Sequence, residues 1–464
     1  MSLTDGVRSE LRATLALAGP LAAANLAMMA MAVTNTVMVG RLGAMPLAAA
    51  GLGGMLYFTL GVILQGVVSA VAPLAAHSLG AGNRAAAGRT AGAAVVLTAL
   101  LALPFIAVMI SLDRLLLALG YDAALAAEIG RYLRAIAWGC PAFLGNAALR
   151  SLLAALSHTR AVMVVQILCI AGNAVLNWAL IFGHLGAPAL GTTGSGYASA
   201  LNQWLTLGGL ALCARIMPRL AALRMWRNAF SAHWSEMRQI LSLGLPIGGM
   251  RGIEVGVFMT AGILMGLLGP AALGAHQLVL NCAGITFMVP LGLSQAVTVR
   301  VAYELGAGRT LAARLAWLVA LALGIGFMSA AAVVLWIAPG AIIGVYVDIG
   351  DPANRETVEI TRRLIAIAAI FQVFDGIQVI AAGALRGYRD TLVPMLLATF
   401  GYWVVGFGAC WLFAFPLGYG AVGLWWGLAL GLAAAAILLT LRLQMLAAPI
   451  LRGAEPAGLS GRIS

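Results

Sequence analysis

The stretch Phe371-Gln-Val-Phe-Asp-Gly-Ile-Gln-Val-Ile-Ala-Ala-Gly-Ala-Leu385 carries a carboxylate, Asp375, near the middle of an apolar run of membrane-spanning length. An aspartate at the centre of a bilayer costs about 2.5–3.5 kcal/mol on insertion scales, so it is retained where it has a partner or a function. At helical spacing it shares one face with three other side chains, Phe371, Gln378 and Ala382. We expect that face to line a protein interior or a water-filled cavity.

The composition excludes a soluble protein. The chain has 464 residues, of which 62% are hydrophobic and 9% charged, and its mean hydropathy is +1.00. Apolar runs of about 18 or more residues recur throughout, which is typical of a polytopic α-helical membrane protein. The formal net charge of +12 lies in loops between these runs. There it fits the positive-inside rule and the headgroups of membrane lipids, and it does not indicate a nucleic-acid partner.

Polar residues divide the chain into about twelve predicted spans. Their approximate ranges are 13–38, 47–75, 92–112, 126–153, 162–183, 192–215, 237–267, 272–298, 315–338, 361–385, 393–415 and 419–446. Arginines gather in alternate loops, whereas the loops 184–191, 268–271 and 416–418 contain none. The arginine-rich side is the cytoplasmic side, so both termini are predicted to be cytoplasmic.

An internal repeat organises the spans. At one constant offset, Leu17-Ala-Gly-Pro20 aligns with Leu243-Gly-Leu-Pro246, and Leu79-Gly-Ala-Gly82 aligns with Leu305-Gly-Ala-Gly308. Each half holds six spans, and an even number gives the two halves the same orientation in the membrane. The sequence therefore predicts two parallel six-helix lobes around a central cavity.

The predicted domains follow from this repeat. The N-lobe covers residues 1–215 and the C-lobe residues 237–464. The linker 216–236 mixes arginines with Trp226 and Trp234, a composition typical of a helix in the cytoplasmic membrane interface, and the alternative is a solvated loop.

Two acidic residues lie deep within predicted spans, and both belong to the C-lobe. They are Asp375 and Glu254. Two facing carboxylates in a low dielectric cannot both stay ionised unless a cation lies between them, so such a pair suits ion or proton coupling. Glu254 has an alternative role, an ion pair with Arg251 on the same helical face. Arg251 is the only arginine that we expect deep in a span.

The N-lobe offers amides instead of acids. Its spans contain Asn25, Asn35, Asn146, Asn173 and Asn177. These side chains can bind a ligand or water but cannot titrate, and hydrogen bonding between helices explains them equally well. Metal clusters and catalytic motifs such as HExxH, CxxC and a Walker loop are absent from the sequence, so we predict neither an enzyme nor a bound cofactor.

Several motifs resemble the multidrug and toxic compound extrusion (MATE) family, NorM branch. They are Gly244–Ile247 with Glu254, Ala275-His-Gln-Leu-Val-Leu-Asn281, Val299-Arg-Val with Leu305–Gly308, Phe371-Gln with Asp375, Ala384-Leu-Arg-Gly-Tyr-Arg-Asp-Thr391, and Asn173-Ala-Val-Leu-Asn177. The resemblance implies a monomeric antiporter of the bacterial inner membrane. It would expel cationic or amphiphilic drugs and dyes by rocking two lobes, in exchange for sodium ions or protons.

The resemblance also implies the site. Asp375 and Glu254 match the coupling acids and would bind sodium if sodium is the coupling ion. The implied substrate cavity comprises Phe371, Gln378, Gln277, Asn281, Asn35, Asn146, Asn173 and Asn177. This chain departs from the family at Asn35 and Asn177, where branches of the family have acids, and at Phe371, where a tyrosine is common.

Two other functions compete with efflux. One is a flippase for lipid-linked precursors, from the same superfamily, which is disfavoured because such proteins usually carry several arginines in the cavity. The other is a membrane enzyme, which is disfavoured because no nucleophile or paired His and acid gathers at one membrane face.

The topology can be tested by labelling. A single cysteine at Ser231, in a background without the five native cysteines, is expected to be protected in intact cells and to react in inverted membranes. The reverse pattern would contradict both the topology and the parallel repeat.

Overall fold

The computed structural model describes residues 3–223, 225–229 and 234–451, and these residues form helices without any strand. They pack as two compact units. Unit 1 combines Met1–Ala22 with Ile253–Ser464, and unit 2 is Ala23–Gly252. Helices suit this apolar chain because a helix satisfies its own backbone N–H and C=O groups where no water is available. The all-α membrane fold predicted from the sequence is confirmed.

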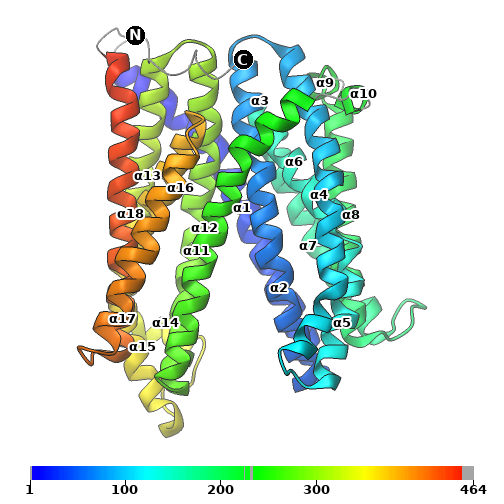
Figure 1. Ribbon diagram of the computed structural model, residues 1–464, viewed down its shortest axis with the longest axis vertical. Helices are drawn as coiled ribbons and strands as arrows, with labels where there is room; N and C mark the ends of the chain where they lie inside the picture. The colour runs from blue at the N-terminus through cyan, green and yellow to red at the C-terminus, as the bar shows by residue number, and fades with distance from the viewer. Residues whose placement is uncertain (1–2, 224, 230–233, 452–464) are drawn as a thin grey trace. The chain divides into compact units, whose positions relative to one another are not determined.

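Unit 2 contains most of the N-terminal helices, which run side by side (Figure 1). They are α2 (Ala44–Ser69), α3 (Val71–Gly80), α4 (Arg84–Ala118), α5 (Ala123–Ala137), α6 (Cys140–Ala155), α7 (Thr159–Phe182), α8 (Gly191–Ile216), α9 (Pro218–Ala221) and α10 (Met225–Ala229).

Unit 1 contains the C-terminal helices. They are α12 (Pro270–Gly306), α13 (Thr310–Ile337), α14 (Pro339–Gly344), the 3-10 helix η1 (Pro352–Asn354), α15 (Arg355–Gly387), α16 (Leu392–Thr399), the π-helix η2 (Phe400–Phe407), α17 (Gly408–Ala414) and α18 (Gly420–Leu451). Two long helices, α1 (Leu3–Gly40) and α11 (Trp234–Leu267), contribute one part to each unit. The lobe limits taken from the repeat stay a prediction, because the units are defined by packing.

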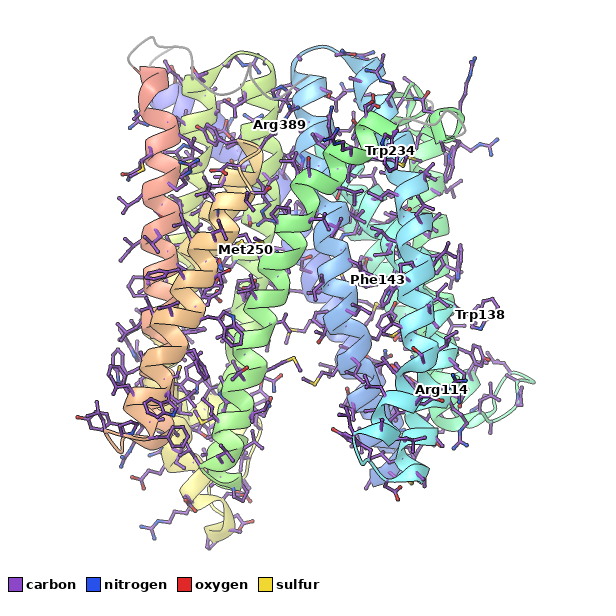
Figure 2. All side chains as sticks on the ribbon, viewed as in Figure 1. Arg114, Trp138, Phe143, Trp234, Met250 and Arg389 are labelled. Carbon is purple, nitrogen blue, oxygen red and sulfur yellow. The ribbon has the colours of Figure 1, made fainter. Side chains whose placement is uncertain are left out.

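The number of spans is close to the prediction. Within the described ranges, ten helices are long and apolar enough to cross a membrane, or eleven if the bent pair Gly191–Ile216 and Pro218–Ala229 is one span. The predicted span 126–153 instead falls on α5 and α6, which have 15 and 16 residues. A turn at Trp138 and Gly139 interrupts the helix. Trp138 is 70% exposed, whereas Phe143, just after the break, packs against Tyr57 (Figure 2).

The linker does not form one interfacial helix. Its described residues include the short helices α9 and α10 and the start of α11, and Arg224 and residues 230–233, including Ser231, lie outside the described part. α10 packs closely on α4, where a Cβ on Gly92 would lie 2.6 Å from the backbone carbon of Asn228. Glycine on α4 therefore lets the linker dock on a neighbouring helix.

The repeat is present in the backbone. Gly43 and Gly269, which end the turns before α2 and α12, both have φ of 113°. Gly82 and Gly308, which follow α3 and α12, have φ of 72° and 73°. L-residues rarely adopt these angles, so glycine is required at equivalent turns of both halves.

Equivalent glutamates anchor the N-terminal parts of α1 and of α11. In unit 1, Glu10 on α1 accepts from Arg300 Nε of α12 at 3.0 Å. In unit 2, Glu236 on α11 accepts from Arg89 Nε of α4 at 2.6 Å. Glu10 and Glu236 align at the offset of the repeat. The same acid thus performs the same anchoring role in each half.

The helix α15 lies at the centre of unit 1, where it packs against α12, α13 and α18. Its contact with α12 is close because a Cβ on Gly383 would lie 2.5 Å from the carbonyl oxygen of Ser294. Hydroxyl groups of α12 bond to its backbone: Ser294 Oγ donates to Val379 O at 2.6 Å, and Thr298 Oγ1 donates to Gly383 O at 2.7 Å. Small residues and hydroxyls at such contacts replace the hydrophobic effect as the source of cohesion in a membrane.

Gly383→Ala is expected to lower the free energy of unfolding by about 1–3 kcal/mol, because its Cβ overpacks the α12–α15 contact. The measurement is thermal unfolding of the purified protein in detergent. Gly326→Ala on α13 is the matched control, since a Cβ there meets nothing within 4 Å. Equal melting temperatures for the two variants would contradict the role given to Gly383.

Candidate functional site

The polar face of α15 is buried in unit 1. Asp375 is only 7% exposed, and Phe371, Gln378 and Ala382 are buried with it. Asp375 is not isolated, since it interacts with at least one other group. The neighbouring Gly376 brings α15 against α13, because a Cβ there would lie 2.8 Å from Met328 Cγ. The carboxylate therefore belongs to a tightly packed helix and not to a mobile loop.

Neutral hydrogen bonds continue the polar face above and below the carboxylate. One turn earlier, Gln372 Oε1 accepts from Thr286 Oγ1 of α12 at 2.9 Å. One turn later, Gln378 Nε2 bonds the hydroxyl of Tyr402. Tyr402 stands on η2, a π-helical segment of a kind often found at functional sites. The sequence singled out neither Tyr402 nor Gln372, although a glutamine in an apolar span was the available signal.

An aromatic cluster covers the same part of α15. The Phe371 ring lies 6.2 Å from that of Phe258 and 5.5 Å from that of Trp425. Trp425 Nε1 donates to His276 Nδ1 at 3.2 Å, and both side chains are fully buried. Phe371, predicted as part of a substrate cavity, is thus packed among aromatic side chains one turn from the carboxylate.

Three further C-lobe candidates stand on α11 and α12. Glu254 is half-buried on α11, and both Glu254 and Arg251 interact with other groups. Gln277 and Asn281 are exposed on α12, where Asn281 Nδ2 donates to Gln277 O at 2.9 Å. No cluster of three or more His, Cys, Asp or Glu side chains that could hold a metal occurs in the described part of the chain.

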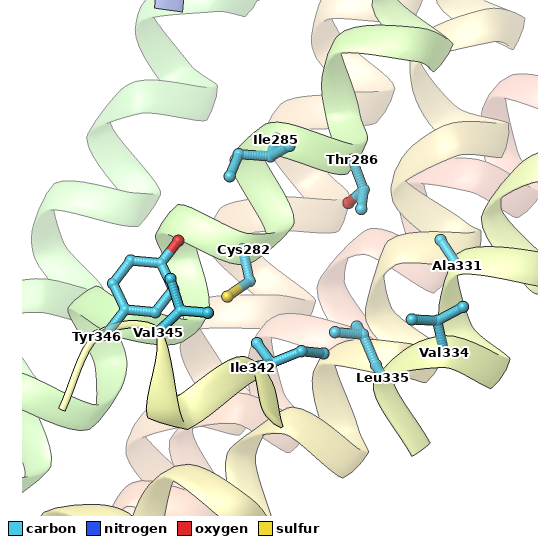
Figure 3. A pocket seen from close by; sticks show the side chains of 9 residues that line it. All are labelled: Cys282, Ile285, Thr286, Ala331, Val334, Leu335, Ile342, Val345 and Tyr346. Carbon is cyan, nitrogen blue, oxygen red and sulfur yellow. The ribbon is translucent and has the colours of Figure 1, made fainter. Parts of the chain in front are cut away.

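An apolar pocket lies beside the polar face, between α12, α13, α14 and the residues that follow α14 (Figure 3). Its volume is about 380 Å³. It is lined by Cys282, Ile285, Thr286, Ala331, Val334, Leu335, Ile342, Val345 and Tyr346. Thr286 connects the pocket to α15, because its hydroxyl is the one that bonds Gln372.

Three of the N-lobe amides come together in unit 2. Asn177 Nδ2 donates to Asn35 Oδ1 and to Asn173 O, each at 2.9 Å, and Asn35 Nδ2 donates to Ser199 Oγ at 3.3 Å. Asn173 is fully buried, and neither atom of its amide has a hydrogen-bond partner in the described structure. This cluster is uncharged, so it can offer hydrogen bonds to a ligand or water but no charge.

The fourth N-lobe amide of the predicted substrate cavity lies in a different contact. Asn146 on α6 donates to Gln203 Oε1 at 2.8 Å and to Gln203 O at 3.0 Å. It therefore joins α6 to α8, and Gln203 is a partner that the sequence did not indicate.

The expectation that Arg251 is the only arginine deep in a span stays a prediction. A further arginine, Arg150, lies in α6, near the end of the predicted span 126–153, and donates to Asn25 Oδ1 of α1 at 2.9 Å. The sequence did not single out this contact.

The chain was compared with known proteins. The MatE family model matches residues 20–179 and 246–412, two ranges that begin at the aligned prolines of the internal repeat. The chain belongs to the MatE family. The resemblance drawn from the sequence motifs is thereby confirmed.

Relatives of the MatE chain carry consistent names. The probable multidrug resistance protein NorM of Burkholderia mallei is 43% identical over 430 residues, which are 92% of this chain and 91% of the relative. The multidrug resistance protein NorM of Burkholderia vietnamiensis is 43% identical and covers 93% of both chains. An outward-facing multidrug resistance MATE family transporter matches with a TM-score of 0.84 at 18% identity, over 96% of this chain and 97% of that chain. The structural likeness shows the shared fold.

The two polar clusters of the MatE chain are expected to differ in importance. Asn35→Ala removes hydrogen bonds worth about 1 kcal/mol, so transport should fall by about fivefold or less. Asp375→Asn removes the buried carboxylate and should reduce transport to background. Dye efflux from cells at matched expression measures both. Equal loss in the two variants would show that the amide cluster is as essential as the carboxylate.

Proposed function

We propose that this protein is a multidrug efflux antiporter, which exports cationic or amphiphilic drugs and dyes in exchange for sodium ions or protons. The observation that carries the proposal is Asp375, a carboxylate held at 7% exposure in the middle of a spanning helix. The names of the NorM relatives and the shared MATE fold support export of drugs.

The buried carboxylate provides a simple route to antiport. In a low dielectric its charge is met by a proton, by a sodium ion or by a cationic drug. The ion and the drug would compete for this carboxylate, and each would favour a different arrangement of the lobes. Because an unoccupied buried charge is costly, the empty transporter would not readily change from one arrangement to the other. Glu254, on α11 of the same unit, is the proposed partner of Asp375.

The surroundings of Asp375 suit this role. Gln372 and Gln378 hold the turns on either side through neutral partners, Thr286 and Tyr402. Phe371 and its aromatic neighbours offer π faces, which attract organic cations. The proposed cavity also includes Gln277 and Asn281, whose exposed amides would supply adaptable hydrogen bonds.

The amide cluster of unit 2 is assigned to drug binding and not to coupling. Asn35 and Asn177 bond each other and cannot change charge with pH. This chain therefore cannot couple transport to ions through acids at these two positions, and we place all coupling in unit 1.

A lipid-linked precursor flippase remains the second candidate. Arg150 favours it, because an arginine inside the N-lobe weakens the argument that the cavity lacks basic residues. Such a protein would translocate a lipid anion and would not lower the accumulation of cationic dyes in cells.

Reconstitution into proteoliposomes tests the proposal. Cationic dye transport is expected to respond to an imposed sodium gradient or pH gradient, applied one at a time, and Asp375→Asn should abolish the response while the protein stays folded. Dye binding to the variant should also lose its dependence on sodium or pH. Gly326→Ala on α13, which leaves all acids and all proposed cavity residues in place and whose Cβ meets nothing within 4 Å, is the matched control and should keep the gradient response. Coupled transport by Asp375→Asn near the wild-type rate would move the coupling site to Glu254.

A further inference from the structure

Arg150 is a guanidinium without a carboxylate partner in the described part of the chain. It stands on α6, is half-buried, and contacts two side chains of α1: Asn25 Oδ1 at 2.9 Å from Nη2, and Met28 Sδ at 2.8 Å from Nη1. Both partners are neutral. An ionised side chain packed among apolar helices with only neutral partners is costly, so its presence calls for a functional or structural reason.

The acids of unit 2 are all committed elsewhere. Within Ala23–Gly252 the sequence has four: Asp113, Asp122, Glu128 and Glu236. Asp113, Glu128 and Glu236 pair with Arg134, Arg131 and Arg89, and Asp122 caps the start of α5. The charge of Arg150 is therefore not neutralised by these acids of its own unit.

The surroundings of Arg150 have more hydrogen-bond donors than acceptors. Asn25 uses its oxygen for the guanidinium, and its Nδ2 group is buried without any acceptor. The guanidinium has five N–H donors, of which the described contacts use two. The amide cannot be turned around, because its N–H groups would then face the guanidinium. Surplus donors beside an uncompensated positive charge fit an oxyanion.

We propose that Arg150 and Asn25 form a binding site for an oxyanion, and that it receives the carboxylate of zwitterionic export substrates. The guanidinium supplies the charge and a planar pair of donors, which suit a carboxylate geometrically. Asn25 Nδ2 supplies a further donor. A transporter with this site could take substrates that carry an acidic group. The substrate assignment rests on the proposed efflux function.

A structural brace between α6 and α1 is the competing explanation. It would need the contacts to Asn25 and Met28 but no anion. The two explanations differ in selectivity, since a brace affects all substrates equally, whereas an oxyanion site affects only those with an acidic group.

A matched pair of dyes separates them. The probes are a rhodamine with a free carboxylate and the same rhodamine as its methyl ester, and the measurement is fluorescence anisotropy with the purified full-length protein. Arg150→Gln is expected to weaken binding of the acid by about tenfold or more, as for loss of a charged hydrogen bond, and to leave the ester unchanged. Met28→Leu is the control, because it removes a neutral contact and keeps every donor, so both dyes should bind as before.

Asn25→Asp provides a second variant that keeps both side chains in place. The new carboxylate would pair with Arg150 and supply the missing acceptor, so binding of the acid should fall while the protein melts at the same or a higher temperature. Equal losses for acid and ester in both variants would overturn the proposal in favour of a brace, and no loss for either dye in any variant would overturn it as a substrate site.

The phosphate of a bound phospholipid is the alternative source of the oxyanion. Native mass spectrometry of the same samples counts retained phospholipids. Fewer phospholipids on Arg150→Gln, with unchanged dye binding, would assign the oxyanion site to lipid, and no change in either quantity would remove the site altogether. These binding data stand apart from transport, so failure of the wild type to transport either dye would count against the efflux function and not against the site.

Discussion

The absence of water from the apolar core of a bilayer is the constraint on which this structure depends. Each helix satisfies its own backbone, and a buried polar side chain without a partner is costly. Here most of those partners are neutral. Gln378 bonds Tyr402, Gln372 bonds Thr286, and Asn177 bonds Asn35. Hydroxyls of α12 bond the backbone of α15 at a contact that only glycine permits at position 383. Charged side chains in such a setting are few, and each one needs a structural or functional explanation.

The two halves share a backbone and differ in chemistry. Equivalent turns have equal angles, as at Gly43 and Gly269 with φ of 113°, and equivalent glutamates anchor α1 and α11. The polar interiors have nevertheless diverged. Unit 1 holds a buried carboxylate among aromatic rings, and unit 2 holds an amide cluster and a guanidinium without an acidic partner in the described structure. A duplicated scaffold can thus carry opposite charges in its two halves, because packing needs only the small residues and turns to be the same in both halves.

Coupling and recognition place different physical demands on these groups. A coupling residue must change charge within the accessible pH range or bind an ion, and only a carboxylate such as Asp375 meets that demand here. A recognition residue needs a fixed charge or fixed hydrogen bonds, which a guanidinium and amides provide at all physiological pH values. Rigid surroundings serve both demands. α15 is held by close packing on three helices, and the position of its carboxylate does not depend on a loop.

The sequence by itself determined the membrane class, the helical fold, the family and the repeat, because these depend on hydropathy and on local backbone requirements such as glycine at residues 43 and 269. It also identified Asp375, since a carboxylate in an apolar run is conspicuous without any structure. Only the tertiary structure decided which side chains meet. Asn35, Asn173 and Asn177 gather in one cluster while Asn146 pairs with Gln203, and Tyr402, Trp425 and Arg150 join the clusters from distant positions. Periodicity gives the face of a helix, but the partner across that face depends on how helices far apart in the sequence pack together.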